Sequence, residues 1–190
     1  MSRVRTFIAL DLGQEIRARL VTLQETLGRS GAEVKWVEPE NLHITLLFLG
    51  EVDQRDLNDV CRAVQDAAGP LPSFPASIEK VGAFPNLRRP RTLWVGVGQG
   101  ERAVIDVHDA LERPLLELGC YRREERKYTP HVTLGRVKSE KGALELETAL
   151  RKKESWQGGE TTIGEVHVMS SELTRDGPIY TVLSRARLGG

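Results

Sequence analysis

Apolar and polar residues follow two different periods along this chain, and each period predicts one kind of element. Residues 4–10 form an apolar run that is rich in β-forming residues and bounded by charge, which is typical of a strand buried on both faces. In residues 13–28 the apolar positions recur at helical spacing, which indicates a helix. Further strands are predicted at residues 34–37, 42–50, 74–81, 92–97, 130–137, 161–173 and 179–188, and further helices at residues 57–68, 103–115 and 144–150.

Turn and cap signals separate several of these elements. Asp53 is a candidate cap for the second helix, and Gly69-Pro70 would end that helix. Pro114 lies late in the third helix, where we expect it to kink the helix or to end its regular part. Asp176-Gly177-Pro178 is a strong turn signal between the last two strands.

The order of the predicted elements indicates the fold class. Several strands follow one another without an intervening helix, which favours mainly antiparallel sheets with the helices packed on the outside. We therefore predict an α+β fold.

One four-residue pattern occurs twice, at residues 43–46 and at residues 131–134. Each copy reads His, β-branched aliphatic, Thr, Leu, and each falls in a predicted strand. Because successive side chains of a strand point to opposite faces, His43 and Thr45 share one face, and so do His131 and Thr133. If the fold brings the two strands together, two imidazoles and two hydroxyls surround one polar cleft, which would suit a phosphate. The halves are not otherwise visibly alike, so the repeat suggests a duplication without establishing one.

Composition and charge limit the possible classes of protein. The chain has 190 residues, 39% hydrophobic and 28% charged, which is the profile of a globular protein with a sizeable core. Lys plus Arg and Asp plus Glu both number 27, so no global charge attracts a polyanion. Any contact with nucleic acid must then be local.

Cysteine usage and hydropathy predict a cytoplasmic protein. The two cysteines, Cys61 and Cys120, lie far apart in no metal-ligand spacing, so we expect reduced structural thiols. The apolar run that ends at Asp11 is too short for a signal peptide. No stretch approaches the roughly 20 apolar residues of a membrane span. We expect no membrane contact and a monomer.

Other candidate sites are weaker. His108 and His167 lack a matching partner, and we interpret both as structural. Zinc would need further ligands at a recognisable spacing, which the sequence does not offer, so we predict no metal. The glycine-rich run at residues 96–100 lacks the spacing of a nucleotide-binding loop and is interpreted as a plain connection.

Two basic segments stand out from the neutral background. Arg88, Arg89 and Arg91 lie in a proline-containing loop, where they form either a solvated surface or a local contact for a polyanion. Residues 121–127 carry four basic and two acidic residues just before the second histidine strand. The sequence leaves both alternatives open.

The paired histidines suit phosphodiester chemistry. Such a reaction removes one proton from the attacking oxygen and delivers another to the leaving oxygen, and imidazole can do either near neutral pH. Each threonine hydroxyl can donate a hydrogen bond to a nonbridging oxygen whose charge grows in the transition state.

These residues resemble a known family. The two His-x-Thr copies are similar to the paired HxTx motifs of the 2H phosphoesterase superfamily, and the surrounding sequence is similar to its RNA 2′,3′-cyclic phosphodiesterase branch, also called 2′-5′ RNA ligase. The stretches that carry the similarity span nearly the whole chain: residues 5–9, 36–50, 84–94, 128–136, 171–173 and 177–180.

The resemblance implies a bilobal fold and an activity. The fold would be a single domain over residues 1–190 made of two closely packed lobes, with pseudo-twofold symmetry, two mainly antiparallel sheets and outer helices. Each lobe would supply one HxTx strand to a central cleft. The implied activity is hydrolysis of a 2′,3′-cyclic phosphate on an RNA or oligonucleotide end to a 2′-phosphate, without metal or other cofactor.

The resemblance also implies residue roles. His43 would donate a proton to the departing 3′ oxygen, His131 would accept a proton from water, and Thr45 and Thr133 would hold the phosphate. Arg136 matches a family arginine near the phosphate.

Several further residues are candidates for substrate binding. Phe48 occupies the place in the first copy that Arg136 occupies in the second, so it would stack on a base. Strict alternation would turn Arg136 away from His131, so we expect an irregularity near Gly135. Thr129 stands where relatives often have arginine, which makes Arg126 and Tyr128 the expected neighbouring contacts.

Two alternative functions stay open at this stage. A related phosphoesterase could act on a small cyclic phosphate, such as a mononucleotide or an ADP-ribose derivative. A non-catalytic module that binds RNA ends would keep the basic loops but would not need both histidines and both threonines. The sequence gives no reason to prefer the reverse reaction, 2′-5′ ligation, as the physiological one.

Overall fold

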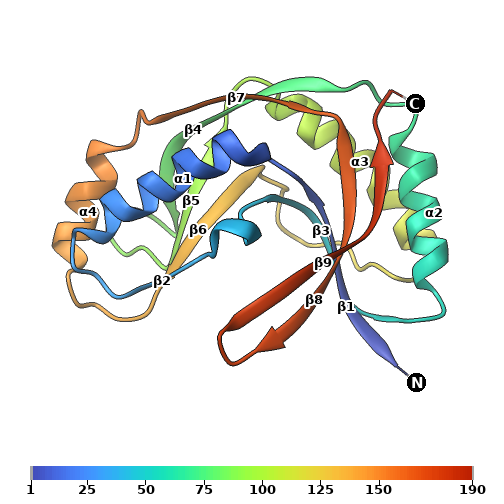
Figure 1. The fold of residues 1–190 in the computed structure, drawn as a ribbon, viewed down its shortest axis with the longest axis horizontal. Helices are drawn as coiled ribbons and strands as arrows, with labels where there is room; N and C mark the ends of the chain where they lie inside the picture. Colours follow the sequence, from blue (N-terminus) through green and yellow to red (C-terminus); the bar gives the residue numbers. More distant parts are fainter. Residues whose placement is uncertain (1, 190) are drawn as a thin grey trace.

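The computed structural model describes residues 2–189 and has four α-helices, one short 3₁₀ helix (Pro39–Asn41) and nine strands in that range. The strands form an antiparallel sheet in the order β7-β4-β5-β6-β3-β1-β8-β9, and β2 adds to β6 at its far end (Figure 1). The strands are β1 (Arg3–Leu10), β2 (Val34–Trp36), β3 (Ile44–Asp53), β4 (Phe74–Phe84), β5 (Thr92–Val97), β6 (His131–Val137), β7 (Gln157–Ile163), β8 (Glu165–Thr174) and β9 (Gly177–Arg187). The predicted α+β class with antiparallel pairing is confirmed.

The sheet has two halves that meet at its centre. Strands β3 and β6 are registered through one residue pair, Ile44 with Val132. The β6 half contains β2, β4, β5, β6 and β7, and the β3 half contains β1, β3, β8 and β9. The predicted pair of sheets is thus joined through this narrow contact into one.

Two helices pack against each half. Helices α1 (Gly13–Gly28) and α4 (Ala143–Lys152) contact each other, and α1 contacts β7 in the β6 half. Helices α2 (Leu57–Ala68) and α3 (Glu101–Glu117) contact each other and the β3 half (Figure 1). Because α1 and β2 lie between β1 and β3 in the sequence, the chain crosses repeatedly between the halves.

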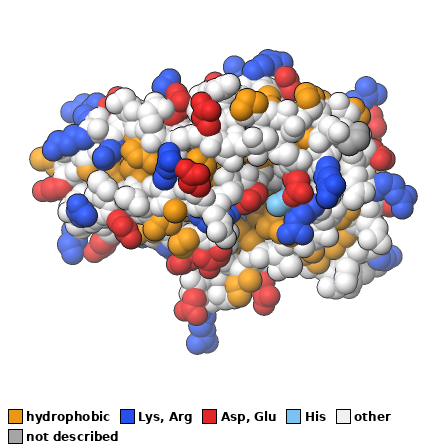
Figure 2. All heavy atoms as spheres, turned by 45° about the horizontal axis from the view of Figure 1, so that its top comes forward, with side chains coloured by type: hydrophobic (Ala, Val, Ile, Leu, Met, Phe, Trp, Pro, Cys, Tyr) orange, Lys and Arg blue, Asp and Glu red, His pale blue; other side chains and the backbone are white. Residues whose placement is uncertain are grey.

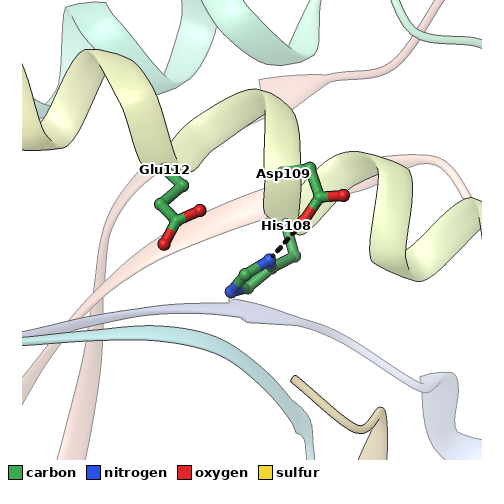
Figure 3. Close-up of side chains that lie close together, drawn as sticks. All are labelled: His108, Asp109 and Glu112. Atoms are coloured by element: carbon green, nitrogen blue, oxygen red, sulfur yellow. Dashed lines mark hydrogen bonds and ion pairs between the residues drawn. The ribbon is translucent and has the colours of Figure 1, made fainter. Parts of the chain in front are cut away.

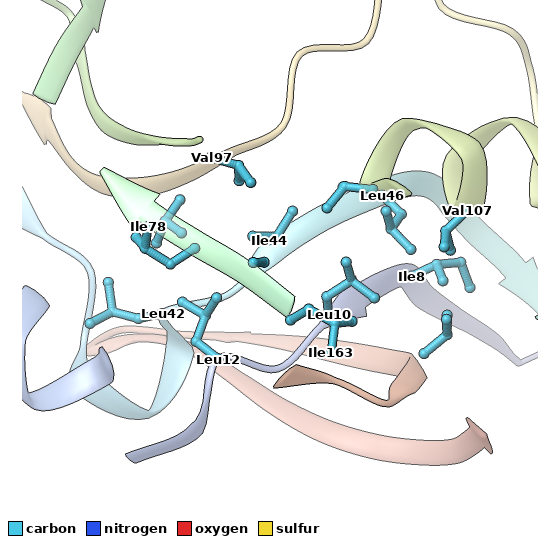
Figure 4. Packing of buried hydrophobic residues seen from close by; sticks show 14 of the residues in the cluster. Ile8, Leu10, Leu12, Leu42, Ile44, Leu46, Ile78, Val97, Val107 and Ile163 are labelled. Atoms are coloured by element: carbon cyan, nitrogen blue, oxygen red, sulfur yellow. The ribbon is translucent and has the colours of Figure 1, made fainter. Parts of the chain in front are cut away.

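The hydrophobic core lies between the sheet and the helices and packs against the face of the motif strands that is opposite the histidines and threonines. Ile44 is fully buried in this cluster (Figure 4), and so are Val132 and Leu134. These are the apolar alternates of the two His-x-Thr copies, so burying them turns the histidines and threonines to the other face. Full burial of such a side chain contributes about 1.5–3 kcal/mol, which makes a one-residue slip of either strand unfavourable.

Both motif strands contain a bulge at the same place. In β3, Leu46 is the extra residue between the pairs Ala9–Thr45 and Ile8–Leu47. In β6, Leu134 is the extra residue between the pairs Trp94–Thr133 and Leu93–Gly135. A bulge reverses the alternation beyond it, so it re-aims every following side chain. The predicted irregularity near Gly135 is confirmed, and it has a counterpart in β3.

Three local predictions are corrected. Residues 157–173 form two strands, because Gly164 separates β7, which pairs with β4, from β8, which pairs with β1. Asp53 does not cap α2; Asp56 stands at the cap position, and Asp53 instead accepts hydrogen bonds from Arg55. Pro114 does not end α3, which continues to Glu117.

The surface carries both signs of charge. Figure 2 shows acidic and basic side chains interspersed over one face, as the zero net charge leads one to expect. Within residues 2–189, no helix combines the length and the apolar character that a membrane span requires.

Candidate active site

A cleft of about 300 Å³ opens where β3 and β6 meet. Both motif histidines and both motif threonines line it, together with side chains of β2, of the segment that follows β2 and of the β8–β9 turn. The lining residues are Lys35, Trp36, Val37, Glu38, Asn41, His43, Thr45, Phe48, His131, Thr133, Arg136, Lys138, Asp176, Gly177, Pro178 and Tyr180.

His43 is held at both ring nitrogens. Its Nδ1 lies 2.6 Å from the carbonyl oxygen of Asn41, and its Nε2 lies 2.7 Å from the hydroxyl of Thr45. A carbonyl oxygen only accepts, so Nδ1 carries the proton, and in the neutral ring the hydroxyl of Thr45 donates to Nε2. The ring also packs against Phe7 and Tyr180, with centroid distances of 5.2 and 5.6 Å.

His131 repeats the first half of this arrangement. Its Nδ1 donates to the carbonyl oxygen of Thr129 at 2.8 Å, again two residues earlier in the chain, and its ring forms a T-shaped contact with Phe84 at a centroid distance of 5.3 Å. Within residues 2–189 its Nε2 has no hydrogen-bond partner, so this nitrogen offers a lone pair to the cleft.

The surroundings of His43 disfavour its charged form. Burial lowers the pKa of His43 below 6.5, and the positive charge on protonated His131 adds to the fall, although the carbonyl of Asn41 opposes it. An anion in the cleft would favour the charged ring and raise this pKa again. Protonated His43 would donate from Nε2 to Thr45, which frees the hydroxyl proton of Thr45 for a ligand.

The paired bulges bring two more predicted residues to the cleft. Beyond Leu46 and Leu134 the alternation is reversed, and Phe48 and Arg136 both line the cleft although they lie five residues after the histidines. The side chain of Phe48 is 55% exposed, so it has a free face for stacking. Arg136 donates from Nη1 to the hydroxyl of Thr92 at 3.2 Å, which fixes the guanidinium beside the cleft.

The other two predicted binding residues lie elsewhere. Arg126 is exposed in the segment before β6 and does not line the cleft. Tyr128 is half-buried beneath the site, where its hydroxyl donates to the backbone carbonyl of Thr45 at 2.8 Å. The structure thus places Tyr128 as a support of β3 and not as a wall of the cleft.

Sequence reasoning missed the contribution of the β8–β9 hairpin. Asn41, which is buried, donates from its side chain to the carbonyl of Pro178 at 2.9 Å, and this bond joins the hairpin turn to the segment that leads into His43. Tyr180 on the same hairpin packs against the His43 ring. The turn signal at residues 176–178 was visible in the sequence, but its position beside the cleft was not.

Three side chains outside the cleft have the donor types of a metal site. His108, Asp109 and Glu112 on α3 each offer a ligand atom, and these atoms lie within 4.8 Å of one another (Figure 3). Each is already engaged, because His108 Nδ1 lies 2.9 Å from Asp109 and Arg123 lies 3.0 Å from Glu112. His108 also stacks on Tyr128 with a centroid distance of 4.1 Å, as expected for a structural residue.

The remaining histidine is also engaged. His167 on β8 lies 3.0 Å from a carboxylate oxygen of Glu165 and does not line the cleft.

The cleft can perform acid–base chemistry on a bound anion. One imidazole has a free basic nitrogen, the other has a nitrogen that can deliver a proton, and two hydroxyls and a guanidinium stand beside them. This set fits the transfer of a phosphoryl group to water.

Comparison with known proteins gives consistent matches. The family described as LigT-like phosphoesterase matches residues 10–94 and residues 95–180, and each segment contains one His-x-Thr copy. The chain is 38% identical to a protein of Methanothermobacter thermautotrophicus named RNA 2′,3′-cyclic phosphodiesterase, over 98% of this chain and 100% of that protein. A protein of the same name from Archaeoglobus fulgidus is 38% identical over 93% of this chain and 96% of its own length. Among solved structures, a protein of Thermus thermophilus matches with a TM-score of 0.82 and 29% identity over 98% of both chains.

Proposed function

The chain belongs to the LigT-like phosphoesterase family, and we propose that it hydrolyses the 2′,3′-cyclic phosphate at the end of an RNA or oligonucleotide to a 2′-phosphate. The observation that carries the proposal is the single cleft shared by His43 and His131, each with its Nδ1 proton committed to a backbone carbonyl two residues earlier. With Nδ1 engaged in that bond, Nε2 is the nitrogen of each ring that can exchange a proton with substrate or water.

We further propose that residues 1–190 form one domain of two lobes. The lobes correspond to the β6 half and the β3 half with their helices, and each contributes one HxTx strand. The repeated crossing of the chain between the halves supports this division, because neither half is a continuous segment that could fold separately.

The proposed reaction is an in-line displacement. Nε2 of His131 takes a proton from water, and the water oxygen forms a bond to phosphorus. The bond between phosphorus and the 3′ oxygen breaks, and Nε2 of His43 delivers a proton to that oxygen. The product carries a 2′-phosphate and a free 3′ hydroxyl, and the two imidazoles end with exchanged protonation states that solvent restores.

Thr45 and Thr133 stabilise the charge that develops on the nonbridging oxygens. Their hydroxyls share the cleft face with the histidines, and removing a comparable donor typically costs about 10²–10³ in rate. Arg136 adds a fixed positive charge, and Phe48 offers an exposed ring for the terminal base. Arg126 and Tyr128, which the sequence suggested as substrate contacts, have no place in this scheme.

Substitution of each cleft histidine tests the proposal. We expect His43→Gln and His131→Gln to abolish hydrolysis of an RNA with a 2′,3′-cyclic phosphate end, while circular dichroism shows an unchanged fold. His167→Gln is the matched control, because among the described residues the His167 ring bonds only Glu165, and it lies outside the cleft. Near-normal turnover by either cleft variant would contradict the proposal.

Product analysis and chelation complete the test. Because His43 is assigned to the 3′ oxygen, we expect a 2′-phosphate product; a 3′-phosphate would exchange the roles of the two histidines. We expect full activity in the presence of a chelator, since the scheme uses no metal. Hydrolysis of a mononucleotide cyclic phosphate but not of RNA would favour a small-molecule substrate instead.

A further inference from the structure

Two surface grooves adjoin the cleft and offer two exits for a bound strand. The first, which we call the arginine groove, has a volume of about 540 Å³ and shares Lys138 with the cleft. It is lined by Arg88, Arg89, Pro90, Arg91, Val137, Lys138, Ser139, Glu140, Lys141, Ala143 and Leu146. The second, which we call the Phe48 groove, shares Phe48 with the cleft and continues along β3 to residues 119–122.

The grooves differ in charge. The charged residues of the arginine groove are five cations and one carboxylate, Glu140. The Phe48 groove has two cations, Arg3 and Arg122, and three carboxylates, Glu51, Asp53 and Asp56. A polyanion that is anchored in the cleft is therefore attracted into the first groove and repelled from much of the second.

The three arginines of the arginine groove are available to a ligand. Arg88, Arg89 and Arg91 are exposed, and within residues 2–189 none of them makes an ion pair. Their backbone is nevertheless fixed, because the side chain of Asn86 accepts hydrogen bonds from the amides of Arg88 and Arg89. Arg91 is tied on both sides, its amide to Phe84 and its carbonyl to the amide of Val137. Free guanidinium groups on a fixed loop are suited to contacts with phosphate.

Positive charge is continuous from the cleft to this groove. Arg136 stands directly opposite Lys35 of β2 and Thr92 of β5, so these side chains share the cleft face of the sheet. Lys138 follows two residues after Arg136 and lines both the cleft and the arginine groove. The path thus runs from His131 past Arg136 and Lys138 to the three arginines.

We propose that the RNA strand on the 5′ side of the cyclic phosphate leaves the cleft over Lys138 and lies in the arginine groove. This inference rests on the proposed function and adds to it the direction of the strand and a preference for substrates longer than one nucleotide. The arginines contact backbone phosphates and read no base, so the added affinity is independent of sequence.

RNA binding by a charge-neutralised variant tests this path. The measurement is the fluorescence anisotropy of a labelled RNA of about ten nucleotides with a 2′,3′-cyclic phosphate end, in the His43→Gln background so that the end persists. Adding Arg88→Gln, Arg89→Gln and Arg91→Gln is expected to raise Kd about tenfold, roughly twofold for each of the exposed contacts. The plot of log Kd against log salt should become shallower by about 2, since each single-strand phosphate contact contributes about 0.7.

The Phe48 groove supplies the matched control. Arg3→Gln with Arg122→Gln removes two exposed cations that line this groove and not the arginine groove, and we expect Kd and the salt slope to stay as in the background protein. Lys138→Gln is a second, single-site variant at the junction of cleft and groove, expected to raise Kd roughly twofold.

The binding measurement tests the proposed RNA path, and the hydrolysis assay tests the proposed reaction separately. Unchanged Kd and salt slope in the arginine variant, or a larger loss in the control variant, would overturn the proposed path whether or not the protein hydrolyses RNA. Weakened binding in the arginine variant alone supports the path. Absence of hydrolysis by the unsubstituted protein, measured separately, would overturn the proposed function while the binding result still decides where the strand lies.

Discussion

The hydroxyl of Tyr128 connects the segment before β6 to the first histidine strand. It donates to the backbone carbonyl of Thr45 at 2.8 Å, and the ring stacks on His108 with an interplanar angle of 3°. Burial raises the pKa of Tyr128, so the hydroxyl keeps its proton and remains a donor at neutral pH. Tyr128→Phe removes this donor and preserves the ring and its stack.

The expected loss of stability in Tyr128→Phe follows from that one hydrogen bond. Leaving a half-buried carbonyl without its partner costs about 1–2 kcal/mol of unfolding free energy. With a urea m-value of about 2–3 kcal/mol/M for a chain of this size, the unfolding midpoint should fall by roughly 0.5 M. Because the bond ends on Thr45, whose hydroxyl is assigned to the phosphate, we also expect kcat to fall while KM changes little.

Urea unfolding followed by tryptophan fluorescence measures the first effect, and steady-state hydrolysis of a cyclic phosphate measures the second. Tyr121→Phe is the control, because Tyr121 is buried, interacts with the backbone of Glu124 in the same segment, and does not line the cleft. The Tyr121→Phe variant should lose stability but keep its kcat. An unchanged midpoint for Tyr128→Phe with a raised KM would refute the reasoning and restore Tyr128 as a substrate contact.

Two more predictions follow from the cleft. In NMR titration His43 should have a pKa below 6.5 in the free protein and a higher pKa with inorganic phosphate bound. Because the unfolded chain binds this proton at higher pH than the folded chain does, His43 should lower the free energy of unfolding as pH falls below about 6.5. A free-protein pKa at or above 6.5 would contradict the burial argument. Gly135→Ala should cost about 1–3 kcal/mol of stability in thermal unfolding and reduce RNA affinity, because its Cβ would lie 2.7 Å from Val34 and 3.0 Å from the carbonyl of Lys35. Gly164→Ala, with open space around it, should change neither, and equal stability of the two variants would show that β2 does not fix this part of β6.

Much of the architecture was encoded locally. The apolar face of α1, with Ile16, Leu20, Leu23 and Leu27 buried, lies where the helical spacing predicted it, from Gly13 to Gly28. Strand β5 also has its predicted bounds. Such elements are predictable because their pattern records which face is buried, and burial dominates the energy of a regular element. Residues 157–160 were not predicted as part of a strand, because these four polar or glycine residues begin an edge strand that, within residues 2–189, pairs only with the distant β4.

The sequence likewise predicted which chemical groups lie at the cleft, but it did not predict what surrounds them. Alternation within each copy placed His43 with Thr45 and His131 with Thr133 on one face before any tertiary contact was considered. The same alternation alone would have turned Arg136 away. Only the pairing with β5 shows Leu134 as an extra residue, because a bulge is a property of two strands in register and not of one sequence.

Sequence alone thus determined the fold class, the two histidine–threonine pairs and the core face behind them, since each depends on residues a few positions apart. Tertiary structure decided what lies around those pairs. It placed the turn at residues 176–178 beside Asn41, put Tyr128 beneath Thr45, and gave one exit of the cleft a positive groove and the other a mixed one. These features join residues up to 137 positions apart, and their energies depend on distances that no local pattern of hydrophobic and polar residues specifies.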